Sequence, residues 1–518
     1  MLKRKITMLA CLGLAATALI PSANVSASTD HYSDSAAITT DASWNTYKEN
    51  WNEISADFTK VSMEPGTNET ELNFAWYSKS ISGQKDTPIV LMGKDKAHLQ
   101  KFTGTTTAVD SSLTNGTAYV SNKVTVTGLV PGNTYYYCVE KNGVCSEVRS
   151  YKLSSTDDVK ILYVGDPQIG ASKGQTQSSE KLVAEDGAAN TAARNDSYSW
   201  NRTLTIAASQ NQDIDFIISA GDQVNKTGKA KEEEYAGFLN ASLLSYVPIA
   251  TTIGNHDSLN EDYSDHFNTA NQTGYGETKA GGDYYYSYGD GLFIVLNTNN
   301  YNVAEHEKVI KEAVAANPDA KWRVVTIHQD IYGSGLDHSD TDGMILRTQL
   351  TPIFDENNID VVLQGHDHTY SRSKLLYGDG QTHDSYEFQL LADGSDYDWD
   401  HAFDLTLSTQ ISLSDEGNNK LLDNFKSDNA CYTIEETNGN TVVNPKGTLY
   451  MTANSASGSK YYELISTQQN YIANRSQNWL PSYSVIDMTK DSFAITTYQI
   501  TENGTTEQID DTFTIVKG

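Results

Sequence analysis

Five apolar runs of β-type sequence, each followed at once by a short polar cluster, constrain this chain more than any other feature. The runs are rich in β-branched residues and are separated by helical or turn-rich stretches, which is typical of buried strands in an α/β sheet. They are VKILYV (159–164), DFIISA (215–220), VPIATTI (247–253), WRVVTI (322–327) and DVVLQ (360–364). The clusters are GDPQ (165–168), GDQVN (221–225), GNHD (254–257), His328 and GHDH (365–368).

The polar clusters supply a set of metal-ligating side chains. Ligands of open α/β sheets bind where the strands end, so these side chains are expected to converge although they are far apart in sequence. A mixed set of carboxylate, amide and imidazole groups suits borderline divalent metals. Two ions about 3.5–4 Å apart can clamp a phosphate and generate hydroxide near neutral pH. The candidate ligands are Asp166, Asp222, Asn255, His328, His366 and His368.

Taken in order, the pattern GD–GD–GNHD–H–GHxH resembles the calcineurin-like metallophosphoesterases, especially the purple acid phosphatase branch with its fibronectin-like domain in front. The resemblance implies an α/β catalytic domain of four αββα layers, preceded by an all-β fibronectin-like sandwich. It also implies that Asp222 bridges two metals. One metal would be shared by Asn255, His328 and His366, and the other by Asp166 and His368.

The resemblance gives His256 the role of approaching the phosphate, as general acid or as a stabiliser of transition-state charge. Asp257 is expected to orient the His256 imidazole, although an Asp in a turn is common for other reasons. Alternation in GHDH turns Asp367 away from the two histidines. His338, in the loop GSGLDHSD, is either a substrate-binding residue or a solvated histidine.

Two positions depart from the family pattern. The common pattern has a His two residues after the first Asp, where this chain has Gln168, and the purple phosphatases have a Tyr three residues after the bridging Asp, where it has Asn225. Gln168, Asn225 or water is therefore expected to complete the coordination of the first metal, and a ferric tyrosinate is not expected. Mn, Fe, Zn or Mg fits such an oxygen-rich set.

The chain is expected to divide into four parts. Residues 1–27 combine Lys3, Arg4 and Lys5 with an apolar stretch and a small-residue cleavage pattern ending at Ala27, which predicts a secretory signal peptide. The segment 28–55 is a lead-in with one weak helix. Short alternating strands with Pro-Gly and Asn-Gly turns predict a β-sandwich over 56–153.

The catalytic domain is expected over 158–518. Helices are predicted at 197–211, 231–244, 303–316 and 344–358, a hairpin-like strand pair at 281–299, and an elaborated loop region at 375–445. Cys138 and Cys145 flank a turn and are predicted to form a disulfide, the alternative being two packed thiols. Cys431 is then left over as a buried small residue.

The net charge of −30 disfavours a nucleic acid or an anionic membrane as a docked partner. The sequence therefore predicts a secreted, dinuclear-metal-dependent phosphoesterase, acid phosphatase-like, in which metal-bound hydroxide attacks a phosphate ester while His256 assists. A nucleotide or phosphodiester hydrolase is the alternative among enzymes. The alternative of another class is an extracellular binding module with a degenerate metal site, which the retained His256 disfavours.

Overall fold

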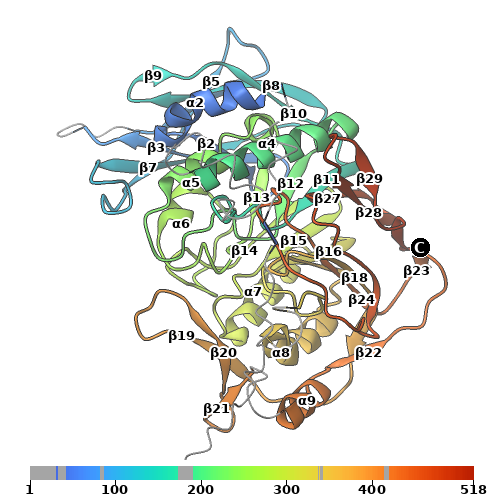
Figure 1. The fold of residues 1–518 in the computed structure, drawn as a ribbon. Helices are drawn as coiled ribbons and strands as arrows, with labels where there is room; N and C mark the ends of the chain where they lie inside the picture. Colours follow the sequence, from blue (N-terminus) through green and yellow to red (C-terminus); the bar gives the residue numbers. More distant parts are fainter. Residues whose placement is uncertain are drawn as a thin grey trace, which may run out of the picture.

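A computed structural model describes residues 31–32, 42–81, 87–172, 191–336, 338, 342–413 and 419–518. The predicted signal peptide lies outside these residues. An all-β domain precedes a larger α/β domain, and the chain ends in strands that return to the α/β domain (Figure 1). Among the described helices, none is long and apolar enough to span a membrane.

The N-terminal domain consists of two antiparallel sheets, as the alternating pattern predicts. One sheet has the order β2 (Val61–Pro65), β3 (Glu71–Lys79), β7 (Tyr119–Thr127), β6 (Thr105–Ala108). The other has the order β10 (Arg149–Leu153), β8 (Asn133–Lys141), β4 (Ile89–Gly93), β5 (Gln100–Thr103), with β9 (Val144–Cys145) added to β8. The alternating tyrosines Tyr135 and Tyr137 are buried in its core, which assigns them to packing.

Cys138 and Cys145 are joined by a disulfide. The two cysteines are not directly opposed, because the register of the hairpin pairs Cys145 with Glu140. The bridge therefore runs diagonally across the β8–β9 hairpin, with its two Cα atoms 5.9 Å apart. Cys431 is buried and free.

The α/β domain contains two mixed sheets. The first has the order β13 (Ile249–Thr251), β12 (Phe216–Ser219), β11 (Asp158–Val164), β27 (Ser482–Thr489), β28 (Ser492–Ile500), β30 (Phe513–Val516), β23 (Thr441–Val443), with β29 (Thr506–Gln508) on β28. The second has the order β14 (Tyr284–Tyr288), β15 (Gly291–Val295), β16 (Trp322–Thr326), β17 (Val361–Gln364), β24 (Thr448–Thr452), β18 (Tyr370–Gly378), β22 (Tyr432–Ile434), with β26 (Ile472–Ser476) on β18.

Alternation along the strands divides the domain into layers. In β11, Ile161 and Tyr163 join the core between the two sheets, whereas Leu162 faces the helices on the other side. In β17, Val361 likewise faces the core between the two sheets, and Val362 faces the helices over the second sheet. The two sheets thus pack face to face between helical layers, which is the predicted αββα arrangement.

The helices follow the predicted positions closely. The lead-in helix is α2 (Trp44–Ala56), and the layer over the first sheet is α4 (Thr191–Gln210), α5 (Glu232–Phe238) and the short helix η2 (Ser242–Ser245). The layer over the second sheet is α7 (Val303–Ala316) and α8 (Asp342–Glu356), while α6 (Asp262–His266) lies in the connection after β13. Two further short strands, β1 (His31–Tyr32) and β25 (Lys460–Tyr461), pair with each other.

The prediction of loops over 375–445 is wrong for much of that stretch. It holds a three-stranded antiparallel sheet and a helix, which form the end of the molecule opposite the N-terminal domain (Figure 1). The elements are β19 (Tyr386–Leu390), β20 (Tyr397–Asp404), β21 (Thr409–Ser412) and α9 (Asn419–Asp428). Tyr386, Phe388 and Tyr397 pack into the core beside α7 and α8. Their burial stabilises these strands, although the Asp- and Gly-rich composition of the stretch does not predict strands.

Candidate metal centre

All six predicted ligands lie together at the carboxyl ends of the strands. Asp166 follows β11, Asp222 follows β12 and Asn255 follows β13, while the three histidines follow β16 and β17 of the second sheet. The site is therefore built where the two sheets meet. Every one of these residues is at most 4 % exposed, so a buried cluster of charged and polar groups needs internal partners.

Glycines allow the loops to approach this closely. A Cβ atom on Gly254 would lie 2.0 Å from Asp222 Oδ1, and one on Gly365 would lie 2.8 Å from Asp166 Oδ2. These two glycines thus make room for a carboxylate from a neighbouring loop.

The backbone of the site adopts an unusual conformation. Five site residues have positive φ angles, a region that residues other than glycine rarely occupy. Such conformations persist where the surrounding structure enforces them, and they gather at functional sites. The residues are Asp166 (46°), Gln168 (36°), Asp222 (49°), His366 (68°) and His368 (46°).

Three ligand atoms converge around His328 Nε2. This atom lies 3.0 Å from Asn255 Oδ1, 3.1 Å from His366 Nδ1 and 3.5 Å from Asp222 Oδ2. Ligands that share one ion at bond lengths of about 2.0–2.2 Å lie roughly 3–3.5 Å apart. His328 Nδ1 donates to the backbone carbonyl of Ala220 over 2.9 Å, which leaves the Nε2 lone pair to face the cluster.

A second group forms on the other side of Asp222. His368 Nε2 lies 3.7 Å from Asp166 Oδ1, while His368 Nδ1 donates to the Lys460 carbonyl over 2.8 Å. Asp166 also accepts the backbone N–H of His366 at 3.0 Å. The ligand atoms of Asp166, Asp222 and His368 all lie within 4.8 Å of one another, as do those of Asp222, His328 and His366. Asp222 belongs to both groups.

The pKa directions describe the electrostatics of this cluster. Burial raises the pKa of Asp166 well above its ordinary value, and Asp222 adds to the effect. Burial also acts to raise the pKa of Asp222, but His328 and His256 outweigh it and lower that pKa. Burial keeps the pKa values of His366 and His368 well below the ordinary value, so both imidazoles are neutral, which is the form that binds metals.

Buried atoms without hydrogen-bond partners among the described residues support a fit to metal ions. One of them is Gln168 Oε1. An amide oxygen is an acceptable ligand for a hard or borderline cation, so Gln168 remains the candidate that completes the first metal. The donor set, two carboxylates, an amide and three imidazoles in two groups sharing one carboxylate, fits a pair of divalent ions.

His256 is held apart from the ligand groups and is more accessible. Its side chain is 22 % exposed, compared with 2 % for Asp222. Its backbone N–H donates to Asp222 Oδ1 over 3.0 Å, and its Nε2 lies 4.0 Å from Asp222 Oδ2. The Nδ1 atom donates to the backbone carbonyl of Asn225, which leaves Nε2 facing the site.

The structure corrects the role predicted for Asp257. The orienting partner of the His256 imidazole is the Asn225 carbonyl, and the Asp257 carboxylate instead accepts the backbone N–H of Gly254 at 3.0 Å. It also accepts the side-chain amide of Gln223 at 3.2 Å. These hydrogen bonds hold the turn that carries Asn255. Burial, with Asp222 adding to it, raises the Asp257 pKa to about 6.

Several other predicted residues have defined places. The ring of His338 stacks on that of His366, with centroids 3.7 Å apart, so this loop histidine lies at the site. Asp367 points away and accepts the Ser334 backbone N–H at 3.0 Å. Tyr370 and Arg372, which follow the GHDH cluster, both donate to the Asp510 carboxylate rather than to the ligand groups.

Three residues of the site were not predicted from the sequence. Trp399 of β20 contacts the rings of His338 and His366, and Tyr462 contacts those of His338 and His368. The Lys460 ammonium donates to the Tyr462 hydroxyl over 2.5 Å. The sequence held a signal for Lys460 and Tyr462, because β24 is another apolar run followed by polar residues. The segment after β24 does reach the site, where Ser455 Oγ donates to the Asp166 carbonyl over 3.0 Å.

Comparisons with known proteins agree with the geometry. The calcineurin-like phosphoesterase family model matches residues 159–370, and the model for the purple acid phosphatase N-terminal domain matches residues 58–153. No curated protein matches the chain.

Among solved structures, the purple acid phosphatase PPD1 from yellow lupin (Lupinus luteus) seeds aligns with a TM-score of 0.56 at 14 % identity, covering 89 % of this chain and 75 % of the other. A structure of PhoD aligns at 12 % identity with a TM-score of 0.49, covering 88 % and 92 %. The first likeness shows the shared fold. Residues 159–370 thus form a domain of calcineurin-like phosphoesterase type, and the matched segment 58–153 in front of it is of the purple acid phosphatase N-terminal type.

Proposed function

We propose that this protein is an exported phosphoesterase of acid phosphatase type that works with two divalent metal ions. The observation that carries the proposal is the shared position of Asp222 in two groups of ligand atoms. One group adds His328 and His366, and the other adds Asp166 and His368. A structural site for one ion would not require a second group on the far side of the same carboxylate.

The residues of the chain have separate tasks in this proposal. Two divalent ions would neutralise the phosphate charge and supply a nucleophile near neutral pH. His256 reaches the reacting phosphate from Nε2, because its Nδ1 is committed to the Asn225 carbonyl. It assists the leaving oxygen as an acid or as a donor to developing charge. Asn225 thus acts through its backbone in orienting His256.

The surroundings favour a phosphate ester with an aromatic group. Trp399, His338 and Tyr462 contact the ligand histidines and form an aromatic boundary around them. Aromatic rings gain from offset or edge-to-face contacts beyond their area. An aryl ester or a nucleotide therefore gains contacts here that a simple alkyl phosphate lacks, and Lys460 adds a positive charge for the phosphate.

Export is the second part of the proposal. The sequence of residues 1–27 has the order of a signal peptide, and a disulfide between Cys138 and Cys145 is characteristic of proteins that mature outside the cytosol. Mass analysis of the protein recovered from the culture medium would find an N-terminus shortly after Ala27. An intact Met1 terminus in exported protein would contradict the cleavage.

A chromogenic phosphate assay tests the function directly. The purified protein is treated with a chelator, passed through a desalting column, and assayed with p-nitrophenyl phosphate before and after addition of Mn²⁺, Fe²⁺, Zn²⁺ or Mg²⁺. The proposal expects loss of hydrolysis on chelation and recovery with at least one divalent ion. Binding of metal without hydrolysis of monoester, diester or nucleotide substrates would favour the binding-module alternative.

A further inference from the structure

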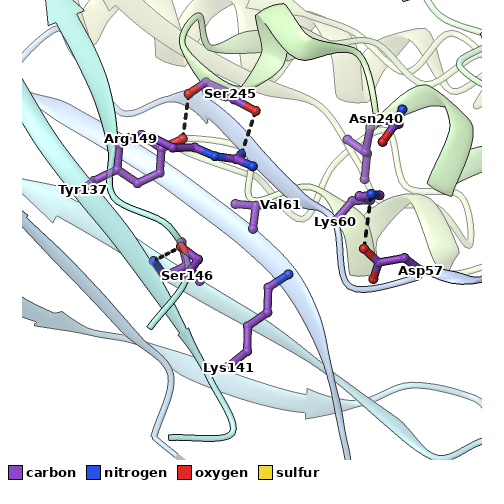
Figure 2. A pocket seen from close by; sticks show the side chains of 11 residues that line it. Asp57, Lys60, Val61, Tyr137, Lys141, Ser146, Arg149, Asn240 and Ser245 are labelled. Atoms are coloured by element: carbon purple, nitrogen blue, oxygen red, sulfur yellow. Dashed lines mark hydrogen bonds and ion pairs between the residues drawn. The ribbon is translucent and has the colours of Figure 1, made fainter. Parts of the chain in front are cut away.

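A cavity whose lining includes none of the candidate metal ligands lies between the N-terminal domain and the catalytic domain. Its volume is about 150 Å³. The strands of the β10-β8-β4-β5 sheet contribute Tyr137, Lys141 and Arg149, and the segment between α5 and η2 contributes Asn240 and Ser245. Figure 2 shows these side chains approaching the same space from the two domains.

The cavity carries more positive than negative charge, although the protein has a net charge of −30. Lys60, Lys141 and Arg149 line it together with a single carboxylate, Asp57. That carboxylate is already engaged, because it lies 3.2 Å from Lys60 Nζ and accepts the Thr59 hydroxyl at 2.6 Å. Asp57 thus acts on both Lys60 and Lys141, and one carboxylate faces three cations in the cavity lining.

The two remaining cations are held in place by neutral oxygens. Lys141 Nζ donates to the Thr59 carbonyl and, over 3.1 Å, to its hydroxyl. Arg149 Nη1 donates to Ser245 Oγ over 2.7 Å, and the Tyr137 hydroxyl donates to the Ser245 carbonyl over 2.7 Å. These bonds use two of the three donors of an ammonium and one of the five of a guanidinium, so N–H groups remain for a ligand.

Burial lowers the pKa of Lys141 to about 8, Asp57 acts against this, and the nearby cations Lys60 and Arg149 act in the same direction as burial. Lys141 and Arg149 are both partly buried, and Asp57 is the one carboxylate in the lining against three cations. A bound anion would add negative charge where positive charge is in excess. The cavity is smaller than the roughly 300–1,000 Å³ typical of sites for drug-sized ligands, which excludes a whole nucleotide. An arginine fork beside a lysine suits a compact oxyanion.

We infer that this interdomain cavity is a binding site for a small oxyanion, of which inorganic phosphate is the case that the proposed reaction would supply. The anion accepts hydrogen bonds from Lys141 and Arg149 of one domain while Arg149 remains bonded to Ser245 of the other. Binding therefore stabilises the contact between the domains. The disulfide joins the two strands of the β8–β9 hairpin, in which Lys141 pairs with Val144, and so fixes one side of the site.

The test is calorimetric titration of the full-length, metal-loaded protein with inorganic phosphate, repeated with sulfate. The unsubstituted protein is expected to bind phosphate at the metal centre and at this second site. Lys141→Met and Arg149→Met should each weaken the second site at least tenfold and leave hydrolysis of p-nitrophenyl phosphate within twofold. The matched control is Lys152→Met. Lys152 is an exposed cation of β10, the strand that also carries Arg149, and it pairs with Asp213 on the surface.

Equal phosphate affinity and stoichiometry in the unsubstituted protein, Lys141→Met and Arg149→Met would overturn the inference. Crystals of the unsubstituted protein soaked in tungstate give an answer that needs no variant. Anomalous density between Lys141 and Arg149 supports the site, whereas density at the metal centre alone contradicts it. Failure of the hydrolysis assay would leave this outcome unchanged, because the cavity contains none of the proposed metal ligands.

Discussion

The ammonium group of Lys231 donates a hydrogen bond to the backbone carbonyl of His256 over 2.7 Å. Lys231 is fully buried, and its Nζ lies 3.7 Å from Asp262 Oδ1. It directly precedes α5, whose first residue, Glu232, accepts hydrogen bonds from Tyr77 of the N-terminal domain and from His266. Two adjacent residues thus contact His256 on one side and the N-terminal domain on the other.

Lys231→Met should lower turnover without removing metal. The substitution keeps the length of the side chain but deletes the donor that holds the His256 carbonyl, and a shift of about 1 Å at a reacting group can cost up to about 10²-fold in rate. Turnover and metal content are measured together. Asp262→Asn is the matched control, since it retains Lys231 and replaces a carboxyl whose pKa burial raises to about 7. Unchanged turnover in Lys231→Met would show that the carbonyl needs no such support.

His256→Ala should leave the metal content intact and reduce turnover by roughly 10²–10⁴-fold, the usual effect of losing a positioned proton-transfer group. The reason is its position beside the ligand groups, with Nε2 4.0 Å from Asp222 Oδ2. Elemental analysis and steady-state kinetics check the two parts separately. Loss of a metal ion would instead make His256 a ligand.

Trp399→Ala should raise KM for an aryl phosphate several-fold more than KM for a short alkyl phosphate. Trp399 is partly exposed and lies 5.5 Å from the ring of His366, centroid to centroid. Paired kinetics with the two substrates give the ratio. Trp479→Ala, at an exposed tryptophan whose ring contacts Tyr461 and not the ligand histidines, serves as the control. An identical change in KM for both esters would remove the aromatic-substrate argument.

Glu64→Gln should raise stability at pH 8 and leave it nearly unchanged below pH 4. Burial raises the pKa of Glu64 from 4.5 to about 8, while Lys123 acts weakly in the opposite direction. The folded state therefore keeps a proton that the unfolded state releases, so stability falls as pH rises from about 4.5 to 8. The variant lacks this slope, and the gain at pH 8 is on the order of a few kcal/mol.

Thermal or urea unfolding across this pH range measures the Glu64 effect. Exposed Glu53→Gln is the control and should reproduce the original slope. The same slope in Glu64→Gln would mean that Glu64 ionises freely in the folded protein. Because the Asn268 backbone N–H donates to Glu64 Oε2 across the domain contact, this measurement also reports on how the two domains dock.

Much of the fold was predictable because its strands and helices have strong periodicity. The helix predicted at 303–316 is α7 with the same bounds, and the predicted strands coincide with β11, β12, β13, β16 and β17 within two residues. The helix predicted at 231–244 instead divides into α5 and η2. Its first part ends at Phe238, whose carbonyl is taken by Trp200 Nε1 at 3.1 Å. That contact comes from a distant helix and leaves no local signal.

The ligand set was predictable for a different reason. Each ligand follows a strand, so its position in space follows from the sheet. Trp399 could not be placed in this way, because it belongs to an insertion whose strands are fixed by packing on α7 and α8. Lys460 and Tyr462 follow β24, but the residues directly after that strand include no histidine or acid to mark them. The Asn225 carbonyl orients His256 through a backbone contact, which the identity of the residue does not predict.

The number of metal ions per chain in the unsubstituted protein and in Asp222→Asn, measured by elemental analysis together with turnover, tests the central claim most directly. Asp222 lies in both ligand groups, and a neutral amide bridges two cations poorly while keeping the shape of the side chain. We predict two divalent ions per chain in the unsubstituted protein, and loss of at least one ion and of activity in the variant. An Asp222→Asn protein that retains two ions and near-normal turnover would contradict the account.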